Sequence, residues 1–505
     1  MKGLQDNRLV VVTLVGAGSF LYFNLFVFPA IPVLLSGDQV FFWMFGQRML
    51  GGECPYRDFF QFTPPGTDLA YLGMFKLFGP RIWATNAVVL LLGVAMCWIC
   101  FKISRRFMDR NAALLATLLY LALVYSRLLN TTHHVFSVFA VMCAVYVLMR
   151  RADGLGLAAA GALLGAASFF TQTHGAAALL AFSIFLFIET RPVQNQRSFW
   201  KAEVTLLAGF FASLLCLSAW FIAHAGLGRL LYFQVYYVLK DNLHGSETAL
   251  LGIPGPRFWR VVPHSFLPYE YAQMFFTYAV LPVTYLWALK WTWKGPGDAA
   301  QPRREVLLLA LTGSFLLAEL AFSINWLRVY AVSMPGIILF VWLITKTQAA
   351  RRYVLAAVWL AIAGLAVQRV CFTQMRHYQV ADLRGGRCAT EAKDYVKLSW
   401  LMQHTKPGDY FFQAGWPGMY IPLELRNPVF LDSASTMFNP QWAKRAVQEL
   451  NSRQVRYVLW APRLNYPIDP HRPWTAHIVP LRDCLHSAYQ RVHVFPDGEE
   501  VWERK

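Results

Sequence analysis

Residues 82–101, IWATNAVVLLLGVAMCWICF, form a run of 20 residues without a charged side chain. An α-helix of about this length crosses the apolar core of a bilayer. Similar runs recur along the chain, and the fifth and sixth are short enough to suggest a tight hairpin. The predicted spans are 9–35, 82–101, 111–129, 133–149, 157–171, 173–188, 202–223, 272–289, 306–324, 329–345 and 353–371. The sequence therefore predicts a polytopic α-helical membrane protein with about eleven transmembrane helices.

The composition agrees with a membrane protein. Of the 505 residues, 56% are hydrophobic and only 15% are charged, whereas soluble domains carry roughly 25% charged residues. This shortage of charge excludes an ordinary cytosolic enzyme and a disordered chain. The formal net charge of +18 does not indicate nucleic acid as a partner, because many basic residues lie in short loops between apolar runs.

The distribution of basic residues predicts the orientation. With the N-terminus in the cytoplasm, the cytoplasmic loops contain 18 Lys and Arg residues and the longer outer loops contain 10. This bias follows the positive-inside rule. Eleven spans then place the C-terminus outside. We expect a multi-pass membrane protein with an extracytoplasmic C-terminal domain.

The predicted domains are a transmembrane module, 1–371, and an extracytoplasmic α/β domain, 372–505. In the second, helical periodicity over 391–403 and 441–451 alternates with short apolar runs at 410–414 and 455–459, a pattern typical of a small α/β domain. Cys388 and Cys484 lie in this part, where an oxidising compartment would permit a disulfide.

Two predicted outer loops, 36–81 and 224–271, are too long to be simple connections, and long loops are usually functional. The first contains GDQVFFWMFGQRMLGGECPYRDFFQFTPPGTDLAYLGMFKLFG, residues 37–79. We expect two helices along the membrane surface, at 40–50 and 67–78. From the residues alone, Asp38 is either a helix cap or a site residue. Asp58 is either the ion-pair partner of Arg57 or a site residue, and Asp68 is expected to interact with a helix dipole.

This loop resembles the first outer loop of GT-C glycosyltransferases, in the branch of protein O-mannosyltransferases and lipid A aminoarabinose transferases. The resemblance rests on residues 36–81, namely Asp38, the following helix, Gly51-Gly52, Tyr56-Arg57-Asp58, Pro64-Pro65 and Leu77-Phe78-Gly79. It implies a GT-C arrangement of helices and Asp38 as the catalytic base, with Asp58 as a second catalytic candidate. Phe62 and Thr63 depart from the Glu-Lys or His that relatives often carry before the double proline.

Three histidines are candidates for substrate binding. His133 and His134 occupy the outer region where relatives often carry a second acidic residue, and His174 lies at the tip of the predicted hairpin. A near-neutral pKa suits contact with a donor phosphate or an acceptor hydroxyl. The alternative is packing among aromatic side chains or solvation. We expect adjacent histidines to point to different sides of a helix, which argues against a chelating pair.

The loop 224–271 mixes aromatic and basic residues, as would suit a lipid phosphate and its sugar or an interfacial aromatic belt. Tyr237, Lys240 and Arg257 are the candidates there, and Arg328 is a further phosphate contact. Glu319 lies inside a predicted span, where a carboxylate is costly unless it is paired or faces a cavity.

The resemblance implies an inverting glycosyltransferase, transferring a hexosyl or pentosyl group from a polyprenyl-phosphate donor to an acceptor hydroxyl on the outer face. The acceptor class (glycan, lipid or protein) stays open, as does a need for a divalent cation. No nucleotide-binding, serine-hydrolase or zinc-protease motif is present, so no cofactor or metal is predicted. A transporter or flippase of a lipid-linked saccharide is the alternative function; a third is a ligase that uses a diphosphate-linked polymer.

Overall fold

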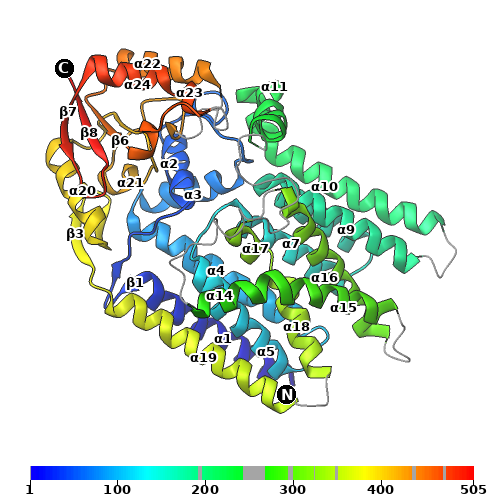
Figure 1. The fold of residues 1–505 in the computed structure, drawn as a ribbon. Helices are drawn as coiled ribbons and strands as arrows, with labels where there is room; N and C mark the ends of the chain where they lie inside the picture. Colours follow the sequence, from blue (N-terminus) through cyan, green and yellow to red (C-terminus); the bar gives the residue numbers. More distant parts are fainter. Residues whose placement is uncertain are drawn as a thin grey trace. The chain divides into compact units, whose positions relative to one another are not determined.

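The computed structural model describes residues 2–190, 196–242, 268–293, 300–322, 325–346, 351–434, 439–469 and 474–505. The chain divides into two compact units. Unit 1 comprises Met1–Asn24, Val89–Ala219 and Thr248–Gln374, and unit 2 comprises Leu25–Val88, Trp220–Glu247 and Met375–Lys505. The helices α4 (Ile82–Ser104) and α10 (Gln196–Ala225) contribute residues to both units; the elements are labelled in Figure 1.

The secondary structure of unit 1 is helical wherever the structure describes it, with two π-helical segments and one 3₁₀ segment joined to the α-helices by short turns. Within it, α7 packs on α8, α9 on α16, and α15 on both α16 and α18. Its elements are α1 (Lys2–Leu25), α4 (Ile82–Ser104), α5 (Arg110–Leu119), η1 (Tyr120–Tyr125), α6 (Ser126–Leu128), α7 (His133–Arg150), α8 (Gly154–Phe170), α9 (Gln172–Thr190), α10 (Gln196–Ala225), α14 (Pro268–Phe275), η4 (Phe276–Val280), α15 (Leu281–Trp293), α16 (Ala300–Glu319), η5 (Leu320–Phe322), α17 (Trp326–Ala331), α18 (Met334–Lys346) and α19 (Arg351–Met375).

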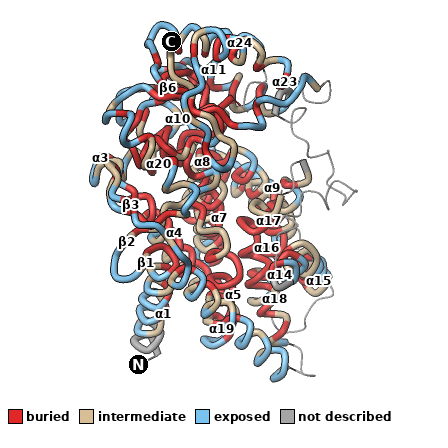
Figure 2. The backbone as a smooth tube through the Cα atoms, turned by 60° about the vertical axis from the view of Figure 1, so that its left-hand side comes forward, coloured by how far each residue is buried: buried red, intermediate tan, exposed pale blue. Residues whose placement is uncertain are grey.

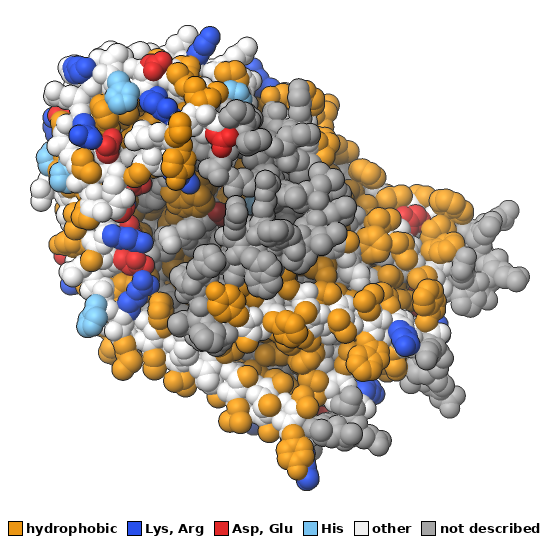
Figure 3. All heavy atoms as spheres, in the orientation of Figure 1, with side chains coloured by type: hydrophobic (Ala, Val, Ile, Leu, Met, Phe, Trp, Pro, Cys, Tyr) orange, Lys and Arg blue, Asp and Glu red, His pale blue; other side chains and the backbone are white. Residues whose placement is uncertain are grey.

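Eight helices in the described part of the chain are long and apolar enough to cross a membrane, and α8 and α18 are shorter apolar helices. Only 17% of the most apolar part of α10 and 11% of that of α19 is buried. Helix α19 is drawn mostly as exposed and intermediate in Figure 2, and hydrophobic side chains are widespread on the face shown in Figure 3. Such exposed apolar surface is expected where helices face lipid. The chain is therefore a multi-pass membrane protein, and the total of eleven spans stays a prediction.

The first predicted span, 9–35, is wrong at its C-terminal end. Helix α1 ends at Leu25, and the short strands β1 (Phe26–Val27) and β2 (Ile31–Pro32) follow as an antiparallel pair. Pro29 and Pro32 lack the backbone N–H that a helix requires, so apolarity continues here while the helix does not. The third span, 111–129, is also irregular, because the π-helical segment η1 separates α5 from α6.

In unit 2, the first outer loop forms α2 (Gln39–Leu50) and α3 (Gly66–Phe78), close to the predicted bounds. Protein covers most of α2, since Phe42, Trp43, Met44 and Phe45 are all buried. Its neighbours include α3 and α21 (Tyr420–Leu423), and its position along the membrane surface stays a prediction.

The predicted loop 224–271 begins with helix. In its described residues the chain forms α11 (Leu227–Leu231) and the π-helical segment η3 (Tyr232–Asn242).

Residues 376–505 combine strands and helices, and the predicted helices and strands are confirmed within one to three residues. A β3–β4 hairpin precedes a four-stranded sheet of order β5-β6-β8-β7, in which only β5 and β6 are parallel. The elements are β3 (Gln379–Leu383), β4 (Gly386–Thr390), α20 (Ala392–His404), β5 (Phe411–Gln413), α22 (Pro440–Ser452), β6 (Tyr457–Trp460), η7 (Pro462–Asn465), α23 (Trp474–His477), α24 (Val479–Ala488), β7 (Tyr489–Val494) and β8 (Glu500–Arg504). Cys388 and Cys484 are free and buried, so they form no disulfide here.

Candidate functional site

Asp38 lies on an exposed turn directly before α2. Its backbone is helical (φ −58°, ψ −22°), and its side chain makes no capping hydrogen bond to the helix, so the capping interpretation is not supported. The preceding Gly37 has φ +90°, a conformation that favours glycine. The Gly37 carbonyl accepts hydrogen bonds from the N–H of Val40 (3.2 Å) and from the indole Nε1–H of Trp416 (3.1 Å). The turn that presents Asp38 is thus fixed from both sides.

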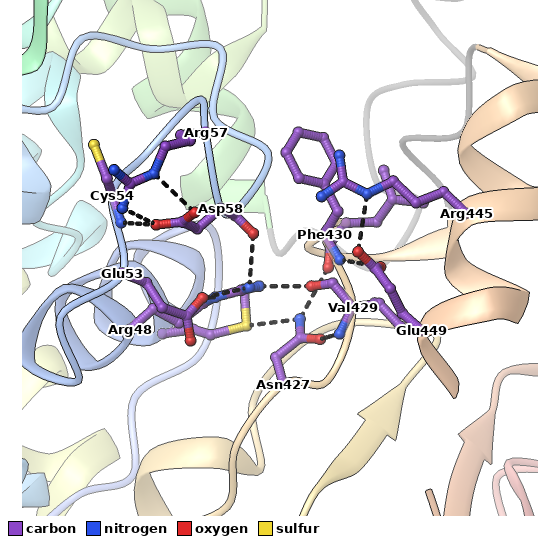
Figure 4. A network of polar contacts seen from close by, with 12 residues as sticks. Arg48, Glu53, Cys54, Arg57, Asp58, Asn427, Val429, Phe430, Arg445 and Glu449 are labelled. Carbon is purple, nitrogen blue, oxygen red and sulfur yellow. Dashed lines mark hydrogen bonds and ion pairs between the residues drawn. The ribbon is translucent and has the colours of Figure 1, made fainter. Parts of the chain in front are cut away.

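Arg48, in the last turn of α2, ties the first outer loop to the C-terminal region (Figure 4). Its guanidinium pairs with the Glu53 carboxylate at 2.6 Å and donates to the Val429 carbonyl at 2.7 Å and to the Asp58 carbonyl at 3.3 Å. The side chain is only 5% exposed, and burial lowers its pKa while Glu53 opposes that shift. These contacts make Arg48 a structural residue of unit 2.

Asp58 accepts two hydrogen bonds from the Arg57 guanidinium, at 2.9 and 2.7 Å, and one from the Cys54 backbone N–H at 2.7 Å. The Arg57 hydrogen bonds, joined by that of Cys54, lower the pKa of the Asp58 carboxyl. The predicted Arg57–Asp58 ion pair is confirmed, and this carboxylate holds the 54–58 turn together (Figure 4). Its catalytic role stays a prediction.

Buried hydrogen bonds link the residues on either side of the double-proline segment. The Gln61 side-chain oxygen accepts hydrogen bonds from the N–H of Phe62 and the N–H and hydroxyl of Thr63, while its amide donates to Asp68 Oδ2 at 2.9 Å. Asp68 is fully buried, and its Oδ1 has no hydrogen-bond partner among the described residues. Burial raises the pKa of Asp68 to about 7. Asp68 lies in the first turn of α3, the position predicted for interaction with the helix dipole. Its carboxyl group is buried there and not exposed to solvent.

Tyr237 belongs to an aromatic cluster, which we define as Tyr56, Phe60, Phe62, Phe233, Tyr237, Phe430 and Trp442. The Tyr237 ring lies 5.2 Å from that of Phe60 and 5.7 Å from that of Trp442, and Tyr237 is 1% exposed. Tyr237 is therefore packed inside unit 2 and does not line an open aromatic belt. Lys240 and Arg257 lie outside the residues whose side chains the structure describes.

In unit 1, His133, His134 and His174 come together at neighbouring helix ends. His133 and His134 begin α7, and their ring centroids are 3.9 Å apart. His133 Nδ1 lies 2.8 Å from the Thr171 hydroxyl, and His134 Nδ1 lies 3.4 Å from His174 Nε2. The two neighbouring rings have different hydrogen-bond partners. Both lie in the first turn, where one ring turns toward Thr171 and the other toward His174.

His174 is fully buried and connects this histidine group to a carboxylate. Its Nδ1 lies 2.6 Å from the Ser137 hydroxyl, and its Nε2 lies 3.4 Å from Glu319 Oε2. Arg328 interacts electrostatically with all three histidines. The structure thus brings together the three predicted histidines and places Glu319 beside His174. In the described part of the chain, no group of three or more His, Cys, Asp and Glu residues could hold a metal ion.

Sequence reasoning did not identify three residues that shape these sites: Arg48, Gln61 and Trp416. Arg48 and Gln61 had a detectable signal, because Arg48 is the one charged residue of the predicted helix 40–50 and Gln61 stands between Phe60 and Phe62. Trp416 stands in Gly415-Trp416-Pro417-Gly418, a turn-like segment. Its contact with Gly37 spans 379 positions and leaves no local signal.

Comparisons with known proteins agree with this description. The family model described as dolichyl-phosphate-mannose-protein mannosyltransferase matches residues 63–222. The crystal structure of ArnT from Cupriavidus metallidurans bound to undecaprenyl phosphate is similar with TM-score 0.62 and 12% identity over 98% of both chains; its apo state gives 0.59 and 14% over the same shares.

A third similar structure is the oligosaccharyltransferase of Archaeoglobus fulgidus, tethered to an acceptor peptide containing the NVT sequon. It has TM-score 0.51 and 14% identity over 98% of this chain and 74% of that one. No curated protein matches the chain by sequence. The resemblance read from the first outer loop is confirmed: the chain has the fold of the GT-C membrane glycosyltransferases.

Proposed function

We propose that this protein is an inverting glycosyltransferase that uses a polyprenyl-phosphate sugar as donor. The observation that carries this proposal is the fold, which is shared over 98% of the chain with ArnT bound to undecaprenyl phosphate. The undecaprenyl phosphate bound to that protein supports, by analogy of fold, a lipid-phosphate donor here. The proposed membrane is the bacterial inner membrane, with the acceptor on the outer face.

In the proposed reaction, Asp38 accepts the proton of an acceptor hydroxyl while that oxygen attacks the anomeric carbon. The new glycosidic C–O bond forms as the bond from the anomeric carbon to the phosphate oxygen breaks. The electron pair leaves with the polyprenyl phosphate, and one displacement inverts the anomeric centre. The exposure of Asp38 and the hydrogen bonds that fix its turn support this role.

The leaving phosphate requires positive charge nearby. Arg328, Lys240 and Arg257 are the proposed sources of this charge, and the histidine group of unit 1 is proposed to contribute hydrogen bonds to the substrate. His133 and His134 are half-buried at the start of α7. Hydrogen-bond donors at a helix N-terminus favour an anion, which supports this assignment.

The test uses purified protein in nanodiscs with synthetic undecaprenyl-phosphate hexoses and pentoses. Acceptors come from a membrane lipid and glycan extract. Mass spectrometry follows both the released undecaprenyl phosphate and the glycosylated product. We expect Asp38→Asn to lower turnover by about 100-fold or more, and the exposed Asp382→Asn control to retain it. Near-normal turnover by Asp38→Asn would remove Asp38 as the base. Transbilayer movement of the donor without any sugar transfer would contradict the glycosyltransferase function and favour the transporter.

A further inference from the structure

A single tryptophan of the C-terminal region lies against the turn that carries Asp38. Trp416 follows β5, and its segment is held firmly by hydrogen bonds. The Ala414 N–H donates to the Leu459 carbonyl at 2.9 Å, and the Met419 N–H donates to the Gln413 side chain at 3.0 Å. The Gly418 N–H also donates to the Trp416 carbonyl at 2.8 Å. Trp416 is therefore presented by a segment fixed at both ends.

The contacts of Trp416 determine which part of its side chain stays available. Its only polar atom, Nε1, donates to the Gly37 carbonyl at 3.1 Å. Its ring meets the Phe41 ring edge-on, with centroids 4.7 Å apart and an interplanar angle of 81°. The residue is nevertheless 38% exposed. Because Nε1 is engaged, the ring surface that remains available is apolar. Gly37, which accepts the Nε1–H hydrogen bond, directly precedes Asp38, whose side chain is exposed.

This pairing has a specific chemical use. The π-face of an aromatic ring is electron-rich and attracts positively polarised hydrogens. A pyranose ring presents several C–H groups on one face and hydroxyls around its rim. A sugar stacked on an indole can therefore direct a rim hydroxyl toward a neighbouring carboxylate. A phosphate or another carboxylate gains nothing from an apolar ring surface, and an acyl chain calls for an extended groove more than for one ring.

We propose that Trp416 is the acceptor-binding platform of this protein, and that the acceptor is a carbohydrate whose reacting hydroxyl faces Asp38. This inference rests on the proposed transferase function and assigns its acceptor class. It also gives the C-terminal region a role: it supplies one residue of the acceptor site. Trp416 contacts the Asp38 turn and the sugar, so it positions both and exchanges no proton itself.

The binding test places 5-fluorotryptophan at position 416 of the full-length protein in nanodiscs. The ¹⁹F resonance is followed while methyl pyranosides of mannose, glucose and galactose are added. We expect a saturable shift with at least one pyranoside and none with glycerol, which has hydroxyls but no ring face. The control label is at Trp400, whose ring is stacked between His404 (3.8 Å) and His493 (5.4 Å). No saturable shift at 416, or an equal shift with glycerol, would overturn the proposal.

The same titration in Asp38→Asn separates the two proposals. We expect the shift at 416 to persist there even though transfer is lost. Persistence of both binding and transfer would contradict Asp38 as the base and leave the platform intact.

A kinetic test uses as acceptor the pyranoside that gives the largest shift. Trp416→Ala should raise its KM by about tenfold with a smaller change in kcat, and Trp416→Phe, which keeps a ring, should recover most of the loss. Equal loss in both variants would indicate that only the Nε1–H contact to Gly37 matters, and would refute the stacking role.

Discussion

Asp68 gives the sharpest physical prediction, because a carboxyl group is fully buried beside only one hydrogen-bond donor. Gln61 donates to Oδ2, while Oδ1 has no partner among the described residues. Replacing Asp68 by Asn keeps the side-chain shape and an acceptor for Gln61 while removing the ionisable proton. We expect this variant to be more stable than the wild type, and increasingly so as the pH rises.

The increase of this stability gain with pH follows from proton linkage. Burial raises the pKa of Asp68 from 3.8 in the reference state to about 7. Between these values the unfolded chain has lost the proton and the folded chain retains it, so raising the pH favours unfolding. The penalty is absent below pH 4 and complete above pH 7. A difference of about 3 pKa units corresponds to about 4 kcal/mol, which is an upper bound because a buried site can relax.

The assay is thermal unfolding of the detergent-purified protein, followed by intrinsic fluorescence from pH 5 to pH 8.5. Asp68→Asn should raise Tm by several degrees, up to roughly 10 °C, at pH 8, with a clearly smaller gain at pH 5. Asp382→Asn, whose side chain is 81% exposed, is the matched control and should leave Tm unchanged at both pH values. An equal gain at pH 5 and pH 8, or no gain at either, would refute the assignment of Asp68 as a buried, neutral carboxyl group.

Three other substitutions test the packing of unit 2 by the same assay. Gly46→Ala places a Cβ 2.9 Å from a side-chain carbon of α3 and should lower the free energy of unfolding by about 1–3 kcal/mol. Gly73→Ala, whose Cβ would meet nothing within 4 Å, should not destabilise the protein, and equal effects of the two substitutions would contradict close α2–α3 packing. Arg48→Met should cost about 3 kcal/mol, since it leaves the carbonyl and carboxylate partners unpaired, and Glu53→Gln should cost less; a harmless Arg48→Met would argue against the network. Asp58→Asn should cost about 1 kcal/mol at pH 7 and progressively less below pH 4, because its lowered pKa makes its stabilisation disappear as the carboxylate is protonated; a loss independent of pH would count against the ion pair.

Most of the helical architecture could be predicted locally. Residues 82–101 were predicted as a helix, and α4 covers Ile82–Ser104. A helix satisfies its own backbone hydrogen bonds, so an apolar run of sufficient length favours the same structure whatever surrounds it. The exception, 9–35, shows the limit of that reasoning: hydropathy counted Pro29 and Pro32 as apolar, but their backbone cannot continue α1.

The candidate site was only partly predictable. Asp38 and the histidines could be named because polar residues at the ends of apolar runs are conspicuous. Their neighbours could not: His134 meets His174 across 40 positions, and Gly37 meets Trp416 across 379. The burial of Tyr237, a predicted substrate-binding residue, likewise depends on Phe60 and Trp442 from other segments.

The sequence by itself determined that this chain is a multi-pass helical membrane protein, and its first outer loop indicated the GT-C fold. These properties follow from hydropathy, charge and short motifs, which act over one or two helical turns or a single loop. Only the tertiary structure decided that Arg48 is held in a hydrogen-bonded network with Val429, that Asp68 is buried, and that Trp416 lies against the Asp38 turn. Those outcomes depend on which distant segments pack together and which polar groups that packing removes from water, and no local pattern encodes either.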